Sequence, residues 1–292
     1  MSSASRESWH RRLAHALCCA AAFLYVTVTV RAAEPATQPV LRIAADPNNL
    51  PFTNDKLEGF ENKIAQLIAG DLGAKVEYTW LAQRRGFFRD TLKHGDAEIV
   101  MGVPTEFEKG TIPTAPYYRS SYVFVSRADR KLDLHTFDDP ILRKLRIGVT
   151  LVGGASNTPP AEALARRGIV DNVVGFSVYN DYSQPNPPAR IIEAVARGDI
   201  DVAIVWGPLA GYFAKRQTTA LEVVPVAPQF QPPATPMVFD ISIGVKRSNK
   251  ALRDQINAVL ARRKPDIDRI LDEYNVPRVP RPAAAMKSEE AK

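Results

Sequence analysis

The stretch ARIIEAVARGDIDVAIVWGP (Ala189–Pro208) decides the fold, because it contains a whole helix, turn and strand in one short segment. Its apolar residues recur at helical spacing up to a Gly-Asp pair, and the apolar run VAIVW follows that pair directly. The earlier stretch GFFRDTLKHGDAEIVMGVP (Gly86–Pro104) has the same plan, with a helix predicted to close at Gly95. A single repeat of this length predicts two similarly built lobes.

The segment that precedes the first copy supports a parallel sheet. Residues 40–47 read as a strand, residues 60–73 as a helix with an apolar face, and residues 76–80 as a second strand. This order predicts an α/β fold in which helices cover a sheet and ligands sit at the carboxyl ends of the strands. Residues 145–150 and 240–249 are further predicted strands, and one helix is expected over residues 251–274.

These elements predict two lobes joined by two strand-like crossings. Residues 41–125 together with 241–276 are assigned to lobe one and residues 126–240 to lobe two. Two crossings imply a hinge, so opening and closing around a cleft is the expected motion. Residues 277–292 are too rich in proline and charge to fold alone and are predicted to be a disordered tail.

The N-terminus reads as an export signal. Three arginines precede an uncharged run, and the small residues of VRAAEPA follow, so a signal peptide over residues 1–32 and a linker over residues 33–40 are predicted. A short membrane anchor is the alternative, which Thr27, Thr29 and His15 disfavour. Cys18 and Cys19 lie within this segment, so cleavage leaves a periplasmic protein without thiol chemistry or disulfides.

Charge and motifs argue against several function classes. The formal charge of +6 falls to +3 after cleavage, because 38 basic and 32 acidic residues become 34 and 31. A net charge of +3 is too small to indicate a nucleic-acid-binding surface. The two remaining histidines, His94 and His135, lack metal-ligand spacing, and neither a catalytic serine motif nor a phosphate-binding loop is present. The carboxylates Glu58, Glu61 and Glu106 are scattered and are interpreted as surface or capping groups.

Six motifs carry a family resemblance that covers about Leu41 to Val276. They are ADPNNLPFTN with GFENKIA, QRRGF, YYRSSYVFV, NTPPAEALARRG and WGPLAGYF. With these motifs the chain resembles the extracellular solute-binding proteins of family 3 and, within them, the J proteins (MoxJ and XoxJ) of bacterial methanol-oxidation operons. The resemblance implies a type II periplasmic binding protein fold with mixed sheets and two hinge strands. It also implies a protein partner, a PQQ-dependent methanol dehydrogenase, whose lanthanide or other type stays open.

Two departures from the family exclude an amino-acid ligand. Amino-acid receptors of this family hold the α-carboxylate with an Arg in a T-x-x-R segment and the α-ammonium with an Asp after the second Gly-Asp strand. Here Thr105 is kept, Glu108 stands where the Arg would be, and Trp206 stands where the Asp would be. Leaving buried charges unpaired costs several kcal/mol each. The group also often carries a cysteine pair near Ala44 and Ala97, which this chain lacks.

Trp206 and Gly207 are the first candidates for the cleft. Gly207 and Pro208 end the strand, so the indole ring either faces the cleft, where it suits an apolar guest or a partner side chain, or belongs to the core. Asp46, Asn48, Asn49 and Phe52 lie in a loop typical of ligand contact, although Asp-Pro and Asn-Asn also form ordinary turns.

The other candidates carry similar alternatives. Arg84 and Arg85, after Trp80, could clamp a carboxylate or be solvated surface groups. Asn157 and Thr158 begin a helix whose N-terminus could bind an anion. The set of tyrosines at the predicted hinge is assigned either to the cleft or to the core: Tyr117, Tyr118 and Tyr122.

Three functions follow from these observations. The first is an accessory protein that binds a protein segment or apolar guest and helps to assemble or activate the dehydrogenase, without being an enzyme or carrying a cofactor or metal. The second is a receptor that delivers a small non-amino-acid solute to an ABC permease. The third, a cleft dehydratase, is disfavoured by the missing histidines and the unpaired carboxylates.

Overall fold

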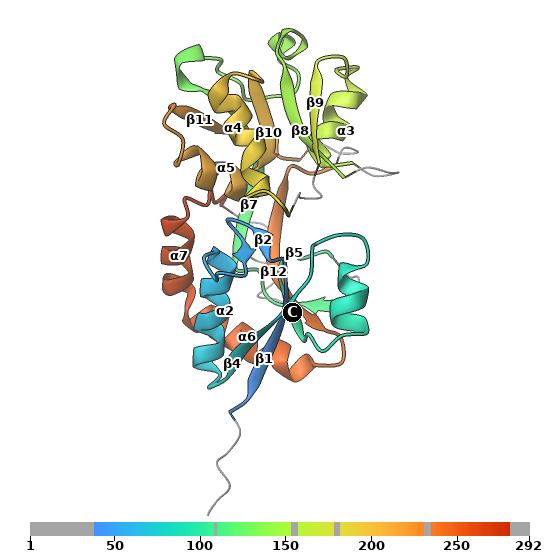
Figure 1. Ribbon diagram of the computed structural model, residues 1–292, viewed down its shortest axis with the longest axis vertical. Coiled ribbons are helices and arrows are strands. Elements are labelled where there is room, and N and C mark those ends of the chain that lie inside the picture. Colours follow the sequence, from blue (N-terminus) through green and yellow to red (C-terminus); the bar gives the residue numbers. More distant parts are fainter. Residues whose placement is uncertain (1–37, 108–109, 153–156, 178–181, 231–234, 281–292) are drawn as a thin grey trace, which may run out of the picture. The chain divides into compact units, whose positions relative to one another are not determined.

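The strands and helices of the first half of the chain follow the order that the sequence predicts (Figure 1). The computed structural model describes residues 38–107, 110–152, 157–177, 182–230 and 235–280. The predicted signal peptide, most of the linker, and residues 281–292 of the tail lie outside these ranges. The first elements are β1 (Val40–Ala45), β2 (Asn48–Asn49), β3 (Thr53–Asn54), α2 (Phe60–Asp71), β4 (Lys75–Trp80), β5 (Ile99–Pro104), β6 (Thr111–Pro113) and β7 (Tyr118–Arg127).

The second half repeats the strand–helix alternation and then returns to the first group of strands. Its elements are β8 (Ile147–Leu151), α3 (Pro159–Arg166), β9 (Val173–Ser177), α4 (Arg190–Arg197), β10 (Val202–Trp206), α5 (Gly207–Ala214) and β11 (Leu221–Pro225). The returning elements are β12 (Val238–Lys246), α6 (Lys250–Arg262) and α7 (Lys264–Glu273).

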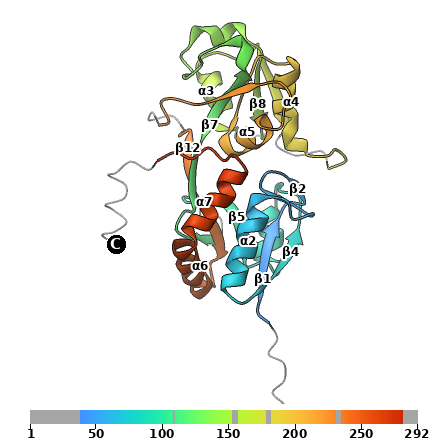
Figure 2. The same cartoon turned by 90° about the vertical axis from the view of Figure 1, so that its left-hand side faces the viewer.

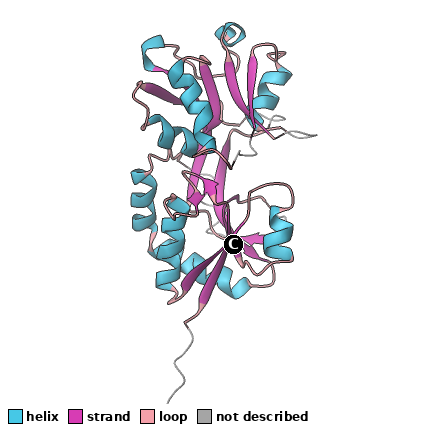
Figure 3. Ribbon diagram, viewed as in Figure 1, coloured by secondary structure: helices cyan, strands magenta, loops and turns pink. Residues whose placement is uncertain are grey.

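The sheet contains two copies of one arrangement. Within the described ranges, hydrogen-bonded neighbours follow the order β4-β1-β5-β12-β7-β10-β8-β9, with β6 on β12 and β11 on β7. β1 lies between β4 and β5 in parallel, and β8 lies between β9 and β10 in parallel. Helices flank both groups (Figure 3). The predicted two-lobed α/β fold with mixed sheets is therefore confirmed.

Two strands run through both groups. β7 pairs with β12 over Tyr118–Ser121 and with β10 over Tyr122–Ser126, antiparallel in both cases. β12 continues from this pairing to β5, also antiparallel. The predicted lobe boundaries fall within β7 and β12, so these two strands are the crossings; the exact bounds of the lobes stay a prediction.

One predicted helix is a short π-helix rather than a regular α-helix. Within residues 86–95 the structure has a short π-helix, Arg89–Lys93, which is capped by His94. The Thr91 hydroxyl donates to the carbonyl oxygen of Phe87 at 2.7 Å, and a Cβ on Gly95 would lie 2.5 Å from the Thr91 carbonyl oxygen. A local side-chain hydrogen bond of this kind competes with regular helix formation.

The predicted helix over residues 251–274 is two helices. α6 ends at Arg262 and α7 begins at Lys264, with Pro265 in the first turn of α7. Proline has no backbone N–H and its ring clashes with the preceding turn, so it starts a helix more readily than it continues one. Both helices lie beside α2 (Figure 2).

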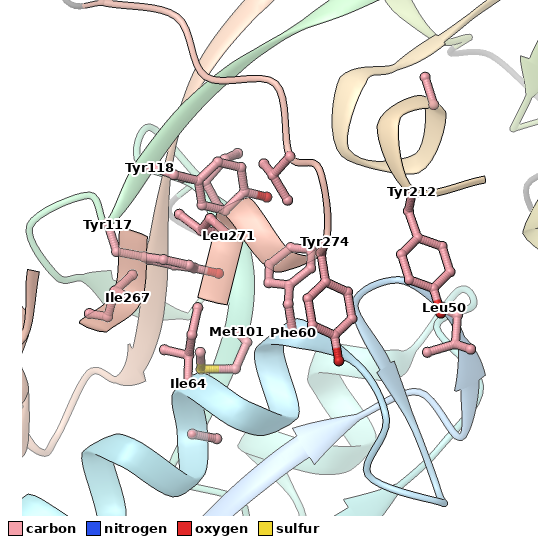
Figure 4. Close-up of a cluster of buried hydrophobic side chains, with 14 of the residues drawn as sticks. Leu50, Phe60, Ile64, Met101, Tyr117, Tyr118, Tyr212, Ile267, Leu271 and Tyr274 are labelled. Atoms are coloured by element: carbon pink, nitrogen blue, oxygen red, sulfur yellow. The ribbon is translucent and has the colours of Figure 1, made fainter. Parts of the chain in front are cut away.

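The core between the helices and β7 is aromatic. Phe60 of α2 is fully buried, with ring centroids 6.0 Å from Tyr118 and 5.8 Å from Tyr274 (Figure 4). Ile64 and Ile68 follow it on the same face and are also fully buried, as the helical spacing predicts. This packing fixes the N-terminal turn of α2 beside the loop that follows β1.

The chain beyond α7 returns to β7. The Pro277 carbonyl oxygen accepts a hydrogen bond from the Ser120 hydroxyl at 2.6 Å, and the Val279 N–H donates to the Arg119 carbonyl oxygen at 3.0 Å. Pro277 and Val279 of the predicted tail are therefore hydrogen-bonded to the crossing strand.

Candidate functional site

Two cavities meet where the carboxyl ends of β1, β5 and β10 come together. The small cavity has a volume of about 150 Å³ and is lined by β1, β5, the start of α2 and the loop after β1. The large cavity has a volume of about 570 Å³ and is lined mainly by β9, the starts of α4 and α5, and Thr158 before α3. Asn49, Phe52 and Trp206 line both cavities and form the boundary between them.

Asp46 is the carboxylate of the small cavity that accepts the most hydrogen bonds. It is 4% exposed, and its Oδ1 accepts from the Asn48 N–H at 2.9 Å while its Oδ2 accepts from the Gln83 N–H at 2.7 Å. The hydroxyl of Tyr182 also donates to Oδ2. Burial, followed by this hydrogen bond to Asp46, raises the pKa of Tyr182 above its ordinary value. Arg84 lies over the ring of Tyr182, 5.1 Å from its centroid.

The predicted site residues in the loop after β1 are held in place by different hydrogen bonds. The Asn48 side chain donates to the Gln184 carbonyl oxygen at 3.0 Å and lines neither cavity. Asn49 donates to the Gln83 side chain at 3.4 Å. The carbonyl oxygen of Phe52 accepts from the Glu61 N–H at 3.0 Å, so the loop caps α2. The loop therefore forms the turn that the sequence predicts, and its contact with a ligand stays a prediction.

Glu61 is the main residue that the sequence interpretation missed. It lines the small cavity, is 5% exposed, and its Oε1 accepts from the Tyr117 hydroxyl at 3.4 Å. Burial raises the pKa of Glu61 to about 8, against the lowering effect of the Tyr117 hydrogen bond. Gly102 makes room for the carboxylate, because a Cβ there would lie 2.2 Å from Glu61 Oε1 and its φ is +68°.

Trp206 combines the two predicted roles. It is the last residue of β10, is half-buried, and its ring centroid lies 5.4 Å from Tyr122 and 6.0 Å from Phe239. Its indole packs on the hydrophobic core, and the same side chain lines both cavities. Gly207 lines neither cavity; a Cβ there would lie 2.7 Å from the Ser121 carbonyl oxygen, so it allows α5 to start against β7.

The start of α3 contributes one candidate to the large cavity. Thr158 lines it and donates its hydroxyl to the Thr150 carbonyl oxygen at 2.6 Å, so this hydroxyl does not cap the helix. Asn157 is exposed and lies outside both linings.

Several predicted residues lie away from both cavities. Trp80 stacks on Tyr78 with centroids 4.4 Å apart, and Arg84 and Arg85 are exposed outside the linings. Thr105 forms hydrogen bonds with Ser242 at 2.8 Å and with the Asp240 carbonyl oxygen at 3.1 Å.

The predicted hinge tyrosines divide between cavity and core, and one candidate cannot be placed. Tyr117 is buried in the core, Tyr118 lines the small cavity, and Tyr122 lines the large one. Glu108 lies outside the described residues.

The apolar wall of the large cavity comes from residues that the sequence interpretation did not single out. Its members beyond the shared boundary include Val174, Phe176, Pro187, Pro188, Ile191 and Leu209. Arg190, which is exposed, is the single Lys, Arg, His, Asp or Glu side chain among the described residues that line this cavity. Tyr122 faces the same space, and burial raises its pKa above the ordinary value. The sequence could not show that these distant segments converge on one space.

The described ranges contain no cluster of three or more His, Cys, Asp or Glu side chains placed to hold a metal ion. In the same ranges, no helix has both the length and the apolar character needed to cross a membrane.

Comparisons with known proteins show the family of this chain. The model of the bacterial extracellular solute-binding proteins, family 3, matches residues 41–277. The chain is 31% identical to the protein MoxJ of Methylorubrum extorquens over 280 residues, which are 91% of each chain. It is 27% identical to the protein MoxJ of Paracoccus denitrificans over 252 residues, 82% of this chain and 89% of that one.

A solved structure extends the comparison to the fold. The crystal structure of the periplasmic binding protein XoxJ from Methylobacterium extorquens AM1 is similar with a TM-score of 0.67 and 37% identity, over 82% of this chain and 100% of that one. MxaJ from Methlophaga aminisulfidivorans MPT, with a TM-score of 0.71 and 24% identity over 82% and 100% of the two chains, has the same fold.

Proposed function

This chain belongs to the bacterial extracellular solute-binding proteins of family 3, and we propose from that premise that it is a periplasmic accessory protein of a PQQ-dependent methanol dehydrogenase. In this proposal the cleft holds a segment of the partner protein or another apolar guest, and binding aids assembly or activation of the dehydrogenase. The protein performs no catalytic step of its own.

The observation that carries the proposal is the lining of the large cavity. Trp206, Phe176, Ile191 and their apolar neighbours surround about 570 Å³, with Arg190 as the one charged side chain of the described lining. Apolar walls with few polar groups suit an aromatic or aliphatic anchor of a partner. A zwitterionic amino acid would bring an ammonium group that meets no carboxylate in the described lining of this cavity, and burying an unpaired charge costs several kcal/mol.

The hydrogen bonds of Thr105 within the protein support the conclusion that an amino acid is not the ligand. Its hydroxyl is occupied by Ser242 and by the Asp240 backbone, and it lies outside both cavities. The similarity to proteins named MoxJ and XoxJ and the motif resemblance described above favour a methanol-oxidation partner over an amino-acid permease.

Co-purification tests the accessory role. The mature protein should co-purify with the methanol dehydrogenase of its host and should raise the yield or activity of that enzyme. Trp206→Ala should weaken this association at least tenfold, because it removes the aromatic wall shared by both cavities. Trp80→Ala is the matched control, since Trp80 stacks on Tyr78 away from both linings. An unchanged dehydrogenase in the absence of the protein would contradict the proposal.

A receptor for a small non-amino-acid solute is the second candidate. The small cavity favours it, because about 150 Å³ with a lining of both polar and apolar residues suits a solute rather than a protein segment. A thermal-shift screen should then find a solute that stabilises the fold by about 2.7 kcal/mol at a hundredfold excess over its Kd. If the screen finds no such solute and the protein binds the dehydrogenase, the receptor function is excluded and the accessory role is supported.

A further inference from the structure

The small cavity contains two carboxyl groups and no cationic partner for them. Asp46 and Glu61 both line it, whereas its described lining contains no Lys, Arg or His. Glu61 is 5% exposed and forms no ion pair within the described ranges. We propose that the small cavity binds a primary alkylammonium group, with Glu61 as its counter-ion. This inference rests on the proposed function, because it names the ligand class of one part of the same cleft.

Hydrogen-bond acceptors around the cavity match the three N–H donors of an ammonium. Asp46 accepts three hydrogen bonds, from Asn48, Gln83 and Tyr182, which leaves about one of its four acceptor positions open. Glu61 has a single side-chain hydrogen bond in the described structure, from Tyr117 at 3.4 Å. Asn49 and Gln83 belong to the same lining, and the side-chain oxygen of Gln83 already accepts from Asn49 at 3.4 Å.

Aromatic rings supply the second half of a cation site. Phe52, Phe87, Tyr118 and Trp206 line the cavity together with its two carboxyl groups. Ring faces attract ammonium groups, and the effect is larger where water is excluded. The volume of about 150 Å³ equals roughly five waters at about 30 Å³ each, so it fits a chain of about five heavy atoms.

Other ligand classes fit this lining less well. An anion would lie beside Asp46 and Glu61 without a cationic side chain in the described lining. A divalent metal ion prefers about six oxygen ligands, and the described ranges contain no metal-binding cluster. An α-amino acid such as lysine would bring a carboxylate that meets no cationic partner here.

Binding of the cation should release a proton. Burial raises the pKa of Glu61 to about 8, so at pH 7 the carboxyl is mostly protonated and must ionise to pair with an ammonium. The other titratable groups that face Glu61 are Asp46 across the cavity and three tyrosines. Burial raises the pKa of each tyrosine above 10, so they stay neutral: Tyr78, Tyr117 and Tyr118.

Calorimetric titration of the mature protein with n-butylammonium chloride tests the proposal. We expect saturable binding at constant ionic strength, tighter at pH 8 than at pH 6, with a heat at pH 7 that differs between phosphate and Tris buffers because a proton is released. Glu61→Gln should weaken binding at least tenfold and remove the buffer dependence. Glu58→Gln is the matched control, because Glu58 is exposed at the start of α2 and lines neither cavity.

Two further ligands distinguish the source of the ammonium group. Nα-acetyl-lysine methylamide presents the same side chain without terminal charges, so its binding would identify a lysine of a protein segment. Binding of n-butylammonium alone would identify a free amine. L-lysine should bind at least tenfold more weakly than n-butylammonium because of its unpaired carboxylate.

Three results would overturn the ammonium site. They are the absence of saturable n-butylammonium binding, equal binding by a folded Glu61→Gln protein, and tighter binding of L-lysine. The titration uses the isolated protein, so these results do not depend on co-purification with a dehydrogenase, and the two proposals can fail separately.

Discussion

Glu61 is the residue whose chemistry depends most on its surroundings. Its folded pKa of about 8 lies above the ordinary value of 4.5, so the folded protein holds a proton that the unfolded chain loses between these two pH values. The free energy of unfolding should therefore fall as pH rises from about 4.5 to about 8 and should show no further loss from this group above that range.

Glu61→Gln should remove this pH dependence. The variant keeps the shape of the side chain but cannot ionise, so at pH 8 it should be more stable than the wild type by up to about 5 kcal/mol, and at pH 4.5 the two should be alike. Urea unfolding at several pH values measures the difference. Parallel stability curves for the two proteins would show that Glu61 is ionised in the fold.

The sequence could not reveal this site at the residue scale. A lone Glu in the first turn of a helix usually faces solvent and interacts with the helix dipole. Glu61 is buried instead because Gly102, far along the chain, has a positive φ and no Cβ to occupy its space. Trp206, in contrast, was recognised from its place at a strand end, although the structure shows it in contact with both core and cavities.

At the element scale, the repeat predicted the strands better than the helices. VAIVW and IVMGVP are apolar runs too short for helices, and both are buried strands beside a parallel neighbour. The two helix errors have local causes, the Thr91 side-chain hydrogen bond and Pro265. The proline was visible in the sequence, whereas the hydrogen bond required the folded turn.

The packing of α5 against the segment after α7 gives an element-scale prediction. A Cβ on Gly211 would lie 1.9 Å from the Asn275 carbonyl oxygen and 3.1 Å from Pro277, and backbone cannot move away cheaply. Gly211→Ala should therefore destabilise the protein by about 1–3 kcal/mol or more in urea unfolding.

Gly70→Ala is the matched control for that substitution. Gly70 lies near the end of α2, is exposed, and has no atom within 4 Å of the added Cβ. The substitution should stabilise the protein by about 0.5–1 kcal/mol, because alanine restricts the unfolded chain. If both variants lost stability equally, the contact between α5 and Asn275 would not explain the effect.

At the scale of the whole molecule, two kinds of connection join the two groups of strands. β7 and β12 cross between them, with Arg119 paired to Asp240 at 2.7 Å where the crossing strands face each other. The second connection joins loops: Tyr182 donates to Asp46, and Asn48 donates to Gln184 at 3.0 Å. The crossings were predictable from continuous apolar strands, but the loop contacts were not, because residues 136 positions apart have no shared pattern.

Tyr182→Phe tests whether the loop contacts hold the cleft together. The substitution removes one hydrogen bond to a buried carboxylate, an interaction that contributes about 1.5–3 kcal/mol and less where the site is open to water. We expect a larger radius of gyration in small-angle X-ray scattering and weaker guest binding, with little change in the urea midpoint, since the core clusters are untouched. Tyr78→Phe removes a buried hydroxyl that takes no part in this contact and should leave the scattering unchanged. Identical scattering and guest affinity for Tyr182→Phe and the wild type would mean that β7 and β12 alone set the relative position of the lobes.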